Sequence, residues 1–471
     1  MRKITQILFY SFPLSFILGN LIVSGQLLLF IIASLILIYK EKLNIRFKNT
    51  YWILILFFLS LIIVTAVHYE SINALKLKLY QSPGLLNEDP NVTAFKDNSI
   101  FKSFLQFRFL ILIFVVDTLF YNKILNLKKF FLFCLCCTSF VSLDVIMQYF
   151  VGFDLFGLKS MGNRNSGPFG DEVIAGGYLQ RFSFVSLFSA LTIFNEKKFK
   201  KPLLILIIII HAVAVLFAGN KMPLLLFLFA SFLTIIFIKE IRSSMIAGMI
   251  GFLIVFFLTI KNDTHMYNVY KNFYGNASNI FTKRVEIKLE NEIEEADSGK
   301  TEINKNKKTG KSERSILRGS GHYYIFHNSI LVWKDQPYFG SGLKSFRVKC
   351  WENLTEKSMS LFVKNKNKKY LACSNHPHNY YLELLAETGV FGFGLILIFF
   401  TIIMKDSFIY LIKKNKESNM ETLLLAPIII SVLLEIWPLK STGSFFSTWN
   451  ATFFWLFISM LLAIETKKLV K

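Results

Sequence analysis

Long apolar runs separated by short basic segments constrain this chain of 471 residues more than any other feature. Many of the runs are long enough for a helix to cross a bilayer. Hydrophobic residues make up 53% of the chain, and the mean hydropathy is +0.47, which is more apolar than ordinary soluble domains. The sequence therefore predicts an all-α polytopic membrane protein, because helices satisfy every backbone polar group inside lipid.

We predict about 12 transmembrane helices from the lengths of these runs. The runs fall at residues 5–20, 23–39, 51–68, 104–121, 130–151, 175–195, 202–218, 223–238, 243–260, 380–404, 421–438 and 446–465. Residues 1–260 then hold helices 1–9, residues 261–379 form one large loop, and residues 380–471 hold helices 10–12.

The net charge of +22 would suggest a nucleic-acid partner in a soluble protein, but here the cations gather at one set of helix ends. These residues include Arg2, Lys3, Lys40, Lys42, Arg46, Lys48, Lys123, Lys128, Lys129, Lys197, Lys198, Lys239, Arg242, Lys413, Lys414, Lys467 and Lys468. By the positive-inside rule, these ends and both termini are predicted to be cytoplasmic, and no nucleic-acid partner is expected. Loops 70–103, 152–174 and 261–379 then face outward.

The large outer loop changes character along its length. Residues 283–314 are rich in Lys, Glu and Asn and nearly lack aromatics, which predicts a charged, partly disordered segment. Aromatic residues return between Ile316 and Cys373, where we expect local packing. Cys350 and Cys373 are the only cysteines of this loop, so an oxidising compartment would pair them as a disulfide. Two free thiols are the alternative, since sequence does not fix the distance between them.

The most informative polar stretch closes this loop at His376-Pro-His378-Asn379. Asn379 is a good N-cap, which predicts a helix from Tyr380 onward. His378 would then lie at the helix mouth, where backbone N–H groups favour an anion, and it is a candidate acid/base group. The alternative is an ordinary helix start with two solvated histidines. Glu383 and Glu387 follow in the same helix; they could orient His378, but we expect them to face the surface.

Several cations fall on the predicted outer face. Arg164 lies in a turn-rich loop, and Lys221 lies between two apolar runs. Arg318 precedes the aromatic part of the large loop. Each could contact an anionic ligand, although Arg164 could equally be an ordinary loop residue and Lys221 could extend to the membrane surface. Arg181 lies inside a predicted span and should face protein or water rather than lipid.

The spacing of His378-Asn379 to Gly389-x-x-Gly392 resembles the signature of the O-antigen ligase and polymerase family of bacterial envelope enzymes. Three further segments are similar to that family's motifs, with Lys221 replacing its usual arginine. They are Arg164 with Gly167–Gly170, Ala218–Lys221, and Arg318 with Asp335–Gly342. The resemblance covers roughly residues 160–400; the preceding spans agree only in topology.

The resemblance implies a glycosyltransferase of the inner membrane that moves a glycan from an undecaprenyl-pyrophosphate donor to an acceptor hydroxyl at the periplasmic face. A ligase uses the lipid A core as acceptor, and we expect this activity first. His378 would be the general base, and Lys221, Arg318 and Arg164 would bind the pyrophosphate. Asn379, Gly389, Gly392 and His376 would support the site. Pyrophosphate is already a good leaving group, so this scheme requires no metal or other cofactor.

Other functions remain open at this point. A polymerase that joins glycans, or an enzyme that glycosylates protein hydroxyls, would belong to the same family. A membrane transporter would place ionisable residues along a path through the spans, and Asp144, His211 and Glu435 are the candidates. A non-catalytic scaffold would leave the histidine signature unexplained.

Overall fold

The computed structural model describes residues 1–81, 98–161, 164–193, 197–271, 322–352, 373–414 and 420–463. Within these ranges the protein is helical, and its only strand-like pairings are isolated bridges in the loop after α7. The helices of the first half are α1 (Arg2–Tyr10), α2 (Phe12–Leu18), α3 (Asn20–Lys40), α4 (Thr50–Val67), α5 (Tyr69–Gln81), α6 (Ser99–Tyr121), α7 (Leu127–Val151) and α8 (Ala175–Ile193). Those of the second half are α9 (Lys197–Phe217), α10 (Lys221–Phe237), α11 (Lys239–Asn262), α15 (His322–Asp335), α16 (Phe346–Glu352), α18 (Tyr380–Lys414), α19 (Met420–Glu435) and α20 (Thr448–Ala463).

Each predicted span corresponds to a helix, apart from the first, which is divided into α1 and α2. In the described part of the chain, 7 helices are long and apolar enough to cross a membrane, and α10, α19 and α20 are shorter apolar helices. This confirms the prediction of an all-α polytopic membrane protein. The break in the first run falls at Ser11, and the turn into α3 falls at Gly19, whose positive φ of 101° suits glycine.

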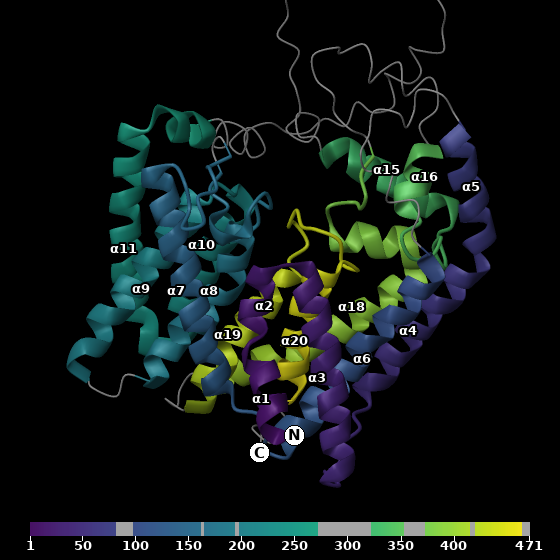
Figure 1. Ribbon diagram of the computed structural model, residues 1–471, viewed down its shortest axis with the longest axis horizontal. Coiled ribbons are helices and arrows are strands. Elements are labelled where there is room, and N and C mark those ends of the chain that lie inside the picture. The colour runs from purple at the N-terminus through teal and green to yellow at the C-terminus, as the bar shows by residue number, and fades with distance from the viewer. Residues whose placement is uncertain are drawn as a thin grey trace, which may run out of the picture.

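The helices form two groups joined at the centre of the bundle (Figure 1). Helices α7 to α11 pack together on one side, and α4, α6 and α18 pack on the other. Helices α19 and α20 lie between the groups, and these two helices and α8 are buried along almost their whole described length. Helix α8 packs against α19, and α20 packs against α6, so the centre connects the two groups.

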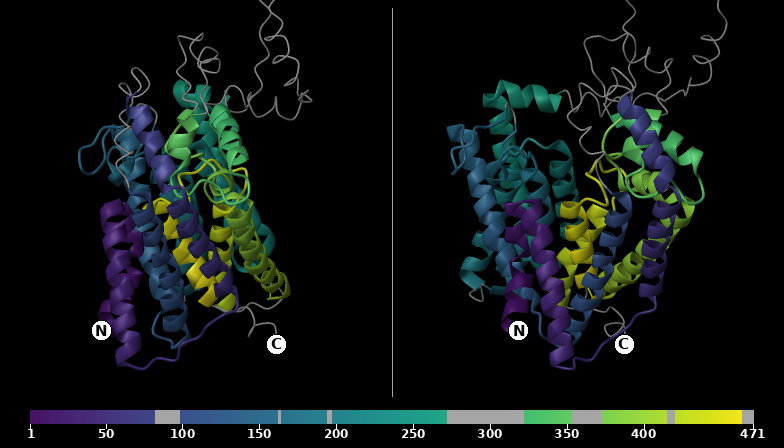
Figure 2. Two further views of the ribbon diagram at one scale, coloured as in Figure 1. Left: turned by 90° about the vertical axis from the view of Figure 1, so that its right-hand side faces the viewer. Right: turned by 45° about the vertical axis from the view of Figure 1, so that its right-hand side comes forward.

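One end of the bundle gathers the N-terminus and the basic loops. Arg2 pairs with Glu41 at 2.6 Å, and Asn122 donates to the carbonyl of Asn44 at 2.9 Å. Lys48 donates to the carbonyl of Leu462, near the end of α20. The predicted grouping of cationic ends is therefore confirmed for these loops, which lie together away from α15 and α16 (Figure 2).

The opposite end carries a small lobe built from α5, α15 and α16 (Figure 1). Its own apolar core contains Ile325, Val332, Phe346 and the two cysteines Cys350 and Cys373. The predicted packing between Ile316 and Cys373 is thus present over the part of that stretch that the structure describes. The charged segment 283–314 lies outside the described residues.

Candidate active site

Asn379 starts helix α18 and fastens a neighbouring loop to it. Its Oδ1 accepts the backbone N–H groups of Tyr381 and Leu382 at 3.0 and 3.2 Å, which confirms the predicted N-cap. Its Nδ2 donates to the carbonyls of Pro438 and Lys440 at 2.8 and 3.3 Å. The loop between α19 and α20 is therefore held over the mouth of α18.

His378 lies in this mouth, in a left-handed backbone conformation with φ of 56°. Its carbonyl accepts the N–H of Thr442 at 2.9 Å, a second bond to the same loop. The centre of its ring lies 4.3 Å from that of His376 and 4.9 Å from that of His322, the first residue of α15. Three histidines from two separate segments of the chain thus meet at one point.

Burial keeps these rings neutral. It lowers the pKa of His378 to about 4, and the neighbouring His322 adds to that shift. Burial also lowers the pKa of His376 to about 3, with contributions from His378 and Arg347. Neither ring nitrogen of His378 makes a hydrogen bond within the described part of the chain, so a neutral imidazole is available to accept a proton.

A buried ionic network supports the loop from below. Glu435, the last residue of α19, accepts Arg181 at 2.6 and 3.1 Å and Lys440 at 2.6 Å. It also accepts the hydroxyl of Tyr380 at 2.7 Å. The network joins α8, α19, α18 and the loop after α19, and it confirms that Arg181 faces protein. Each buried charge has an opposite partner, as a low-dielectric interior requires.

Glu383 and Glu387 do not face the surface, so that expectation was wrong. They are only 3% and 1% exposed. Glu383 accepts the N–H of Phe445 at 2.6 Å and the hydroxyl of Ser444. The loop after α19 covers one side of the helix, and the segment after α15 covers another, since Gly342 donates to the carbonyl of Glu387 at 2.9 Å. The sequence shows two polar positions in a helix but not the loops that bury them.

Gly389 and Gly392 have structural roles in bringing two distant motifs together. Gly389 interrupts α18 with φ of 61°, and a Cβ there would lie 2.4 Å from the carbonyl of Tyr338. Beyond the break, Val390 donates to Pro337 at 2.9 Å and Phe391 donates to Tyr338 at 3.0 Å. A Cβ on Gly392 would lie 2.5 Å from the side chain of Thr388. The segment Asp335–Gly342 therefore docks by its backbone onto the glycines that follow His378.

Lys221 and Arg164 lie at the same end of the bundle as His378. Lys221 is the first residue of α10 and directly follows Asn220. The side chain of Asn220 packs against Gly176, because a Cβ added to this glycine would lie only 2.9 Å from its Oδ1. Gly176 lies in the first turn of α8, and Arg181 of the ionic network follows roughly 7.5 Å further along that helix. Arg164 is exposed in the loop that leads to α8, and the neighbouring Asn165 donates to Phe217 at 2.6 Å. Arg318 lies outside the described residues.

Residues 203–397 match the family model described as O-antigen ligase. Over this stretch, the chain is similar to the O-antigen ligase family. The match begins in α9 and ends inside α18, so it contains Lys221, His378 and both glycines of the docking contact. No curated protein matches the chain in sequence. This similarity, together with the apolar helices, supports a membrane enzyme of the O-antigen ligase or polymerase type.

The network of Arg181, Glu435 and Lys440 was not predicted from the sequence. Arg181 and Glu435 are 254 positions apart, and neither lies within the family match. His322 was also missed as a neighbour of His378. An ionisable residue in an apolar run was the only available signal, and it shows that a partner exists without identifying it.

The predicted disulfide between Cys350 and Cys373 is present, with Cα atoms 5.6 Å apart. It closes a loop whose two ends lie on α16 and just before His376. Asn328 of α15 donates to the carbonyl of Cys350 at 3.0 Å, which places the bridge in the core of the small lobe of α5, α15 and α16. The bridge thus anchors the chain shortly before the histidine cluster.

The residues that would mark a transporter path have local partners instead. The ring of His211 bonds to the hydroxyls of Ser142 and Ser186 at 2.9 and 3.0 Å. Asp144 accepts the N–H of Leu155 at 2.8 Å. Glu435 belongs to the ionic network. The second carboxylate oxygen of Asp144 is buried without a hydrogen bond among the described residues. His211 and Glu435 have partners within the bundle, which favours an enzyme over a transporter.

Proposed function

We propose that this protein transfers a glycan from undecaprenyl pyrophosphate to the lipid A core, as an O-antigen ligase, with His378 as general base. The single observation that carries the proposal is the position of His378. Its ring is neutral, makes no hydrogen bond within the described residues, and lies at the mouth of α18 inside the family match.

The proposed reaction is a displacement at the anomeric carbon of the donor sugar. The acceptor oxygen forms a bond to that carbon while its proton passes to the imidazole of His378. The bond from the carbon to the pyrophosphate oxygen breaks, and the pyrophosphate leaves with the electron pair. A positioned general base contributes about 10²–10⁴ in rate.

The proposed donor is anionic, so the mechanism requires positive charge close to its pyrophosphate. The leaving pyrophosphate gains negative charge in the transition state, and cations close to it would lower the barrier. We assign this role to Lys221, with Arg164 and Arg318 as further contacts. Lys221 supplies a point charge where an arginine would supply two parallel donors, so its contact depends on charge more than on shape.

The proposed placement follows the distribution of basic loops. The end with Arg2, Lys48 and Asn122 would face the cytoplasm of a bacterial inner membrane, and both termini with it. The histidine cluster and the small lobe would then face the periplasm, with residues 70–103, 152–174 and 261–379 as periplasmic loops. The disulfide agrees with this assignment because the periplasm is oxidising.

The proposal is tested with purified protein, a glycan-linked undecaprenyl-pyrophosphate donor and lipid A core acceptor. We expect wild-type transfer, loss of about 10²–10⁴ in rate for His378→Ala, and a much milder loss for His376→Ala. Wild-type rate in His378→Ala would show that this histidine is not the base.

A deletion strain then separates the two activities of the family. Loss of all polymer from lipid A, with accumulation of carrier-linked polymer, supports the ligase. Single repeat units on lipid A would instead assign the polymerase.

A further inference from the structure

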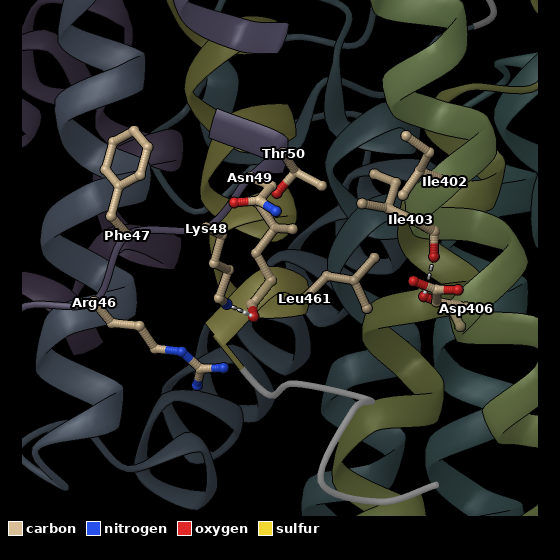
Figure 3. Close-up of a pocket in the computed structure, with 11 residues that line it drawn as sticks. Arg46, Phe47, Lys48, Asn49, Thr50, Ile402, Ile403, Asp406 and Leu461 are labelled. Carbon is tan, nitrogen blue, oxygen red and sulfur yellow. Dashed lines mark hydrogen bonds between the residues drawn. The ribbon is translucent and has the colours of Figure 1, made fainter. Parts of the chain in front are cut away.

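A cavity of about 310 Å³ lies at the end of the bundle away from His378 (Figure 3). It is formed by the loop between α3 and α4, the second half of α18 and the end of α20. Its size is at the low end for small-molecule sites, which suits a polar headgroup better than a whole lipid. It shares no lining residue with the histidine cluster, so the transfer reaction does not account for it.

The polar groups of this cavity carry opposite charges on opposite sides. The guanidinium of Arg46 points in from the loop, and the carboxylate of Asp406 lies across the cavity on α18 (Figure 3). Lys48, between them, is held by Asp117 at 3.1 Å and by the carbonyl of Leu462. Asp406 has no hydrogen bond or ion pair within the described residues, and the buried hydroxyl of Thr50 also has no partner there.

Exposed aromatic residues around the cavity indicate its level relative to the membrane. Phe47 and Trp52 flank it and are 51% and 59% exposed, and Tyr121 on α6 is 45% exposed. Aromatic side chains concentrate where the hydrocarbon of a bilayer meets the headgroups. The guanidinium of Arg46 lies 5.7 Å from the centre of the Tyr121 ring, so this cation is at the same level. The cavity is therefore at headgroup depth.

We propose that this cavity binds the headgroup of an aminophospholipid, of the phosphatidylethanolamine class. Arg46 and the hydroxyl of Thr50 would donate to the phosphate, and Asp406 would accept the primary ammonium. The carboxylate of Asp406 determines which headgroup binds. The neutral glycerol of phosphatidylglycerol offers it no positive charge, and the trimethylammonium group of phosphatidylcholine could not donate a hydrogen bond to it.

Such a lipid would connect parts of the chain that are far apart in sequence. The loop before α4, the second half of α18 and the end of α20 all line the cavity. A bound headgroup would stabilise the assembled state by mass action. The headgroup would contact the second half of α18, the helix whose first turn lies beside His378.

The test uses full-length protein in detergent, freed of lipid, with binding measured by native mass spectrometry and by thermal shift. The probes are phosphatidylethanolamine, phosphatidylcholine and phosphatidylglycerol with the same acyl chains, and inorganic phosphate alone. Wild type should bind phosphatidylethanolamine about tenfold more tightly than the other two, since one charge-assisted hydrogen bond contributes roughly that factor.

The variants separate the two halves of the headgroup. Arg46→Ala should weaken binding of every phospholipid about tenfold, and Asp406→Asn should remove the preference over phosphatidylcholine. Arg46→Gln replaces the first variant if that one does not fold. Lys129→Ala removes an exposed cation at the same end, outside the cavity, and should bind as wild type does.

The proposal is overturned if wild type binds the three lipids equally or prefers phosphatidylglycerol. It is also overturned if inorganic phosphate alone gives the full thermal shift, or if Arg46→Ala and Lys129→Ala behave alike. None of these measurements involves glycan transfer, so they succeed or fail independently of the proposed function.

Discussion

The hydroxyl of Tyr380 donates to Glu435 at 2.7 Å, which ties the first turn of α18 to the last turn of α19. The same carboxylate holds the buried Arg181 and Lys440. Glu435→Ala would leave two cations buried without their partner, which costs about 3–5 kcal/mol. We expect a clearly lowered midpoint of thermal unfolding in detergent. Glu70→Ala, at an exposed position on α5, is the control; an equal midpoint in both variants would show that the network does not stabilise the fold.

The pH dependence of transfer should follow the lowered pKa of His378. Protonation removes the base, so kcat/KM should fall only as the pH approaches about 4, well below the ordinary value for histidine. Bound pyrophosphate favours the charged imidazole, so the acid limb of kcat should lie at higher pH than that of kcat/KM. Rate profiles between pH 4 and pH 8 check this. An acid limb of kcat/KM near the ordinary pKa of about 6.5 would contradict it.

Replacing His322 gives a second check on that pKa. His322→Gln removes a neighbour whose charge and bulk both lower the pKa of His378. The acid limb of kcat/KM should therefore move to higher pH while the plateau rate stays within a few fold. An unmoved limb with a reduced plateau would indicate that His322 only packs against the site.

Lys221 should tolerate a change that keeps its charge and fail one that reverses it. Lys221→Arg should transfer at a rate near that of wild type, and Lys221→Glu should lose most activity, because a pyrophosphate contact needs positive charge. The comparison is made on donor KM and kcat with purified proteins of equal thermal midpoint. Equal activity of the two variants would reject the donor-site role.

Substitution of Gly389 should destabilise the protein, whereas substitution of Gly394, five positions later, should not. Gly389→Ala places a side chain at positive φ and against the backbone of Tyr338, at a cost of at least about 2 kcal/mol. Gly394→Ala adds a methyl group to open space in the same helix and should gain about 0.5–1 kcal/mol. Thermal midpoints of the two variants test the contrast, and similar midpoints would argue against the docking contact.

Local signals predicted the part of this molecule that depends on neighbours in sequence. Apolar runs indicated the helices, Asn379 indicated the start of α18, and two cysteines in one outer loop indicated their bridge. Each of these rests on length, capping chemistry or compartment. The division of the first run at Ser11 was missed because its residues are apolar on both sides of the break.

The rest depends on tertiary contacts that no local pattern contains. Glu383 and Glu387 read as surface residues because glutamate is usually exposed, yet loops from two other parts of the chain cover them. Arg181 and Glu435 each required a partner, but many charged residues could have supplied it. The meeting of His322 with His378 follows from how α15 packs on α18, which periodicity does not determine.

The break at Gly389 also has a mechanical consequence. A helix interrupted at one residue would ordinarily bend there like a hinge, with its two halves free to tilt. Here Ser341 and Gly342 donate to carbonyls before the break, while the carbonyls of Pro337 and Tyr338 accept N–H groups beyond it. Because the segment is bonded to both sides of the break, we expect the two halves of α18 to behave as one rigid body, so that a displacement of its membrane half would be transmitted to the turn that carries His378.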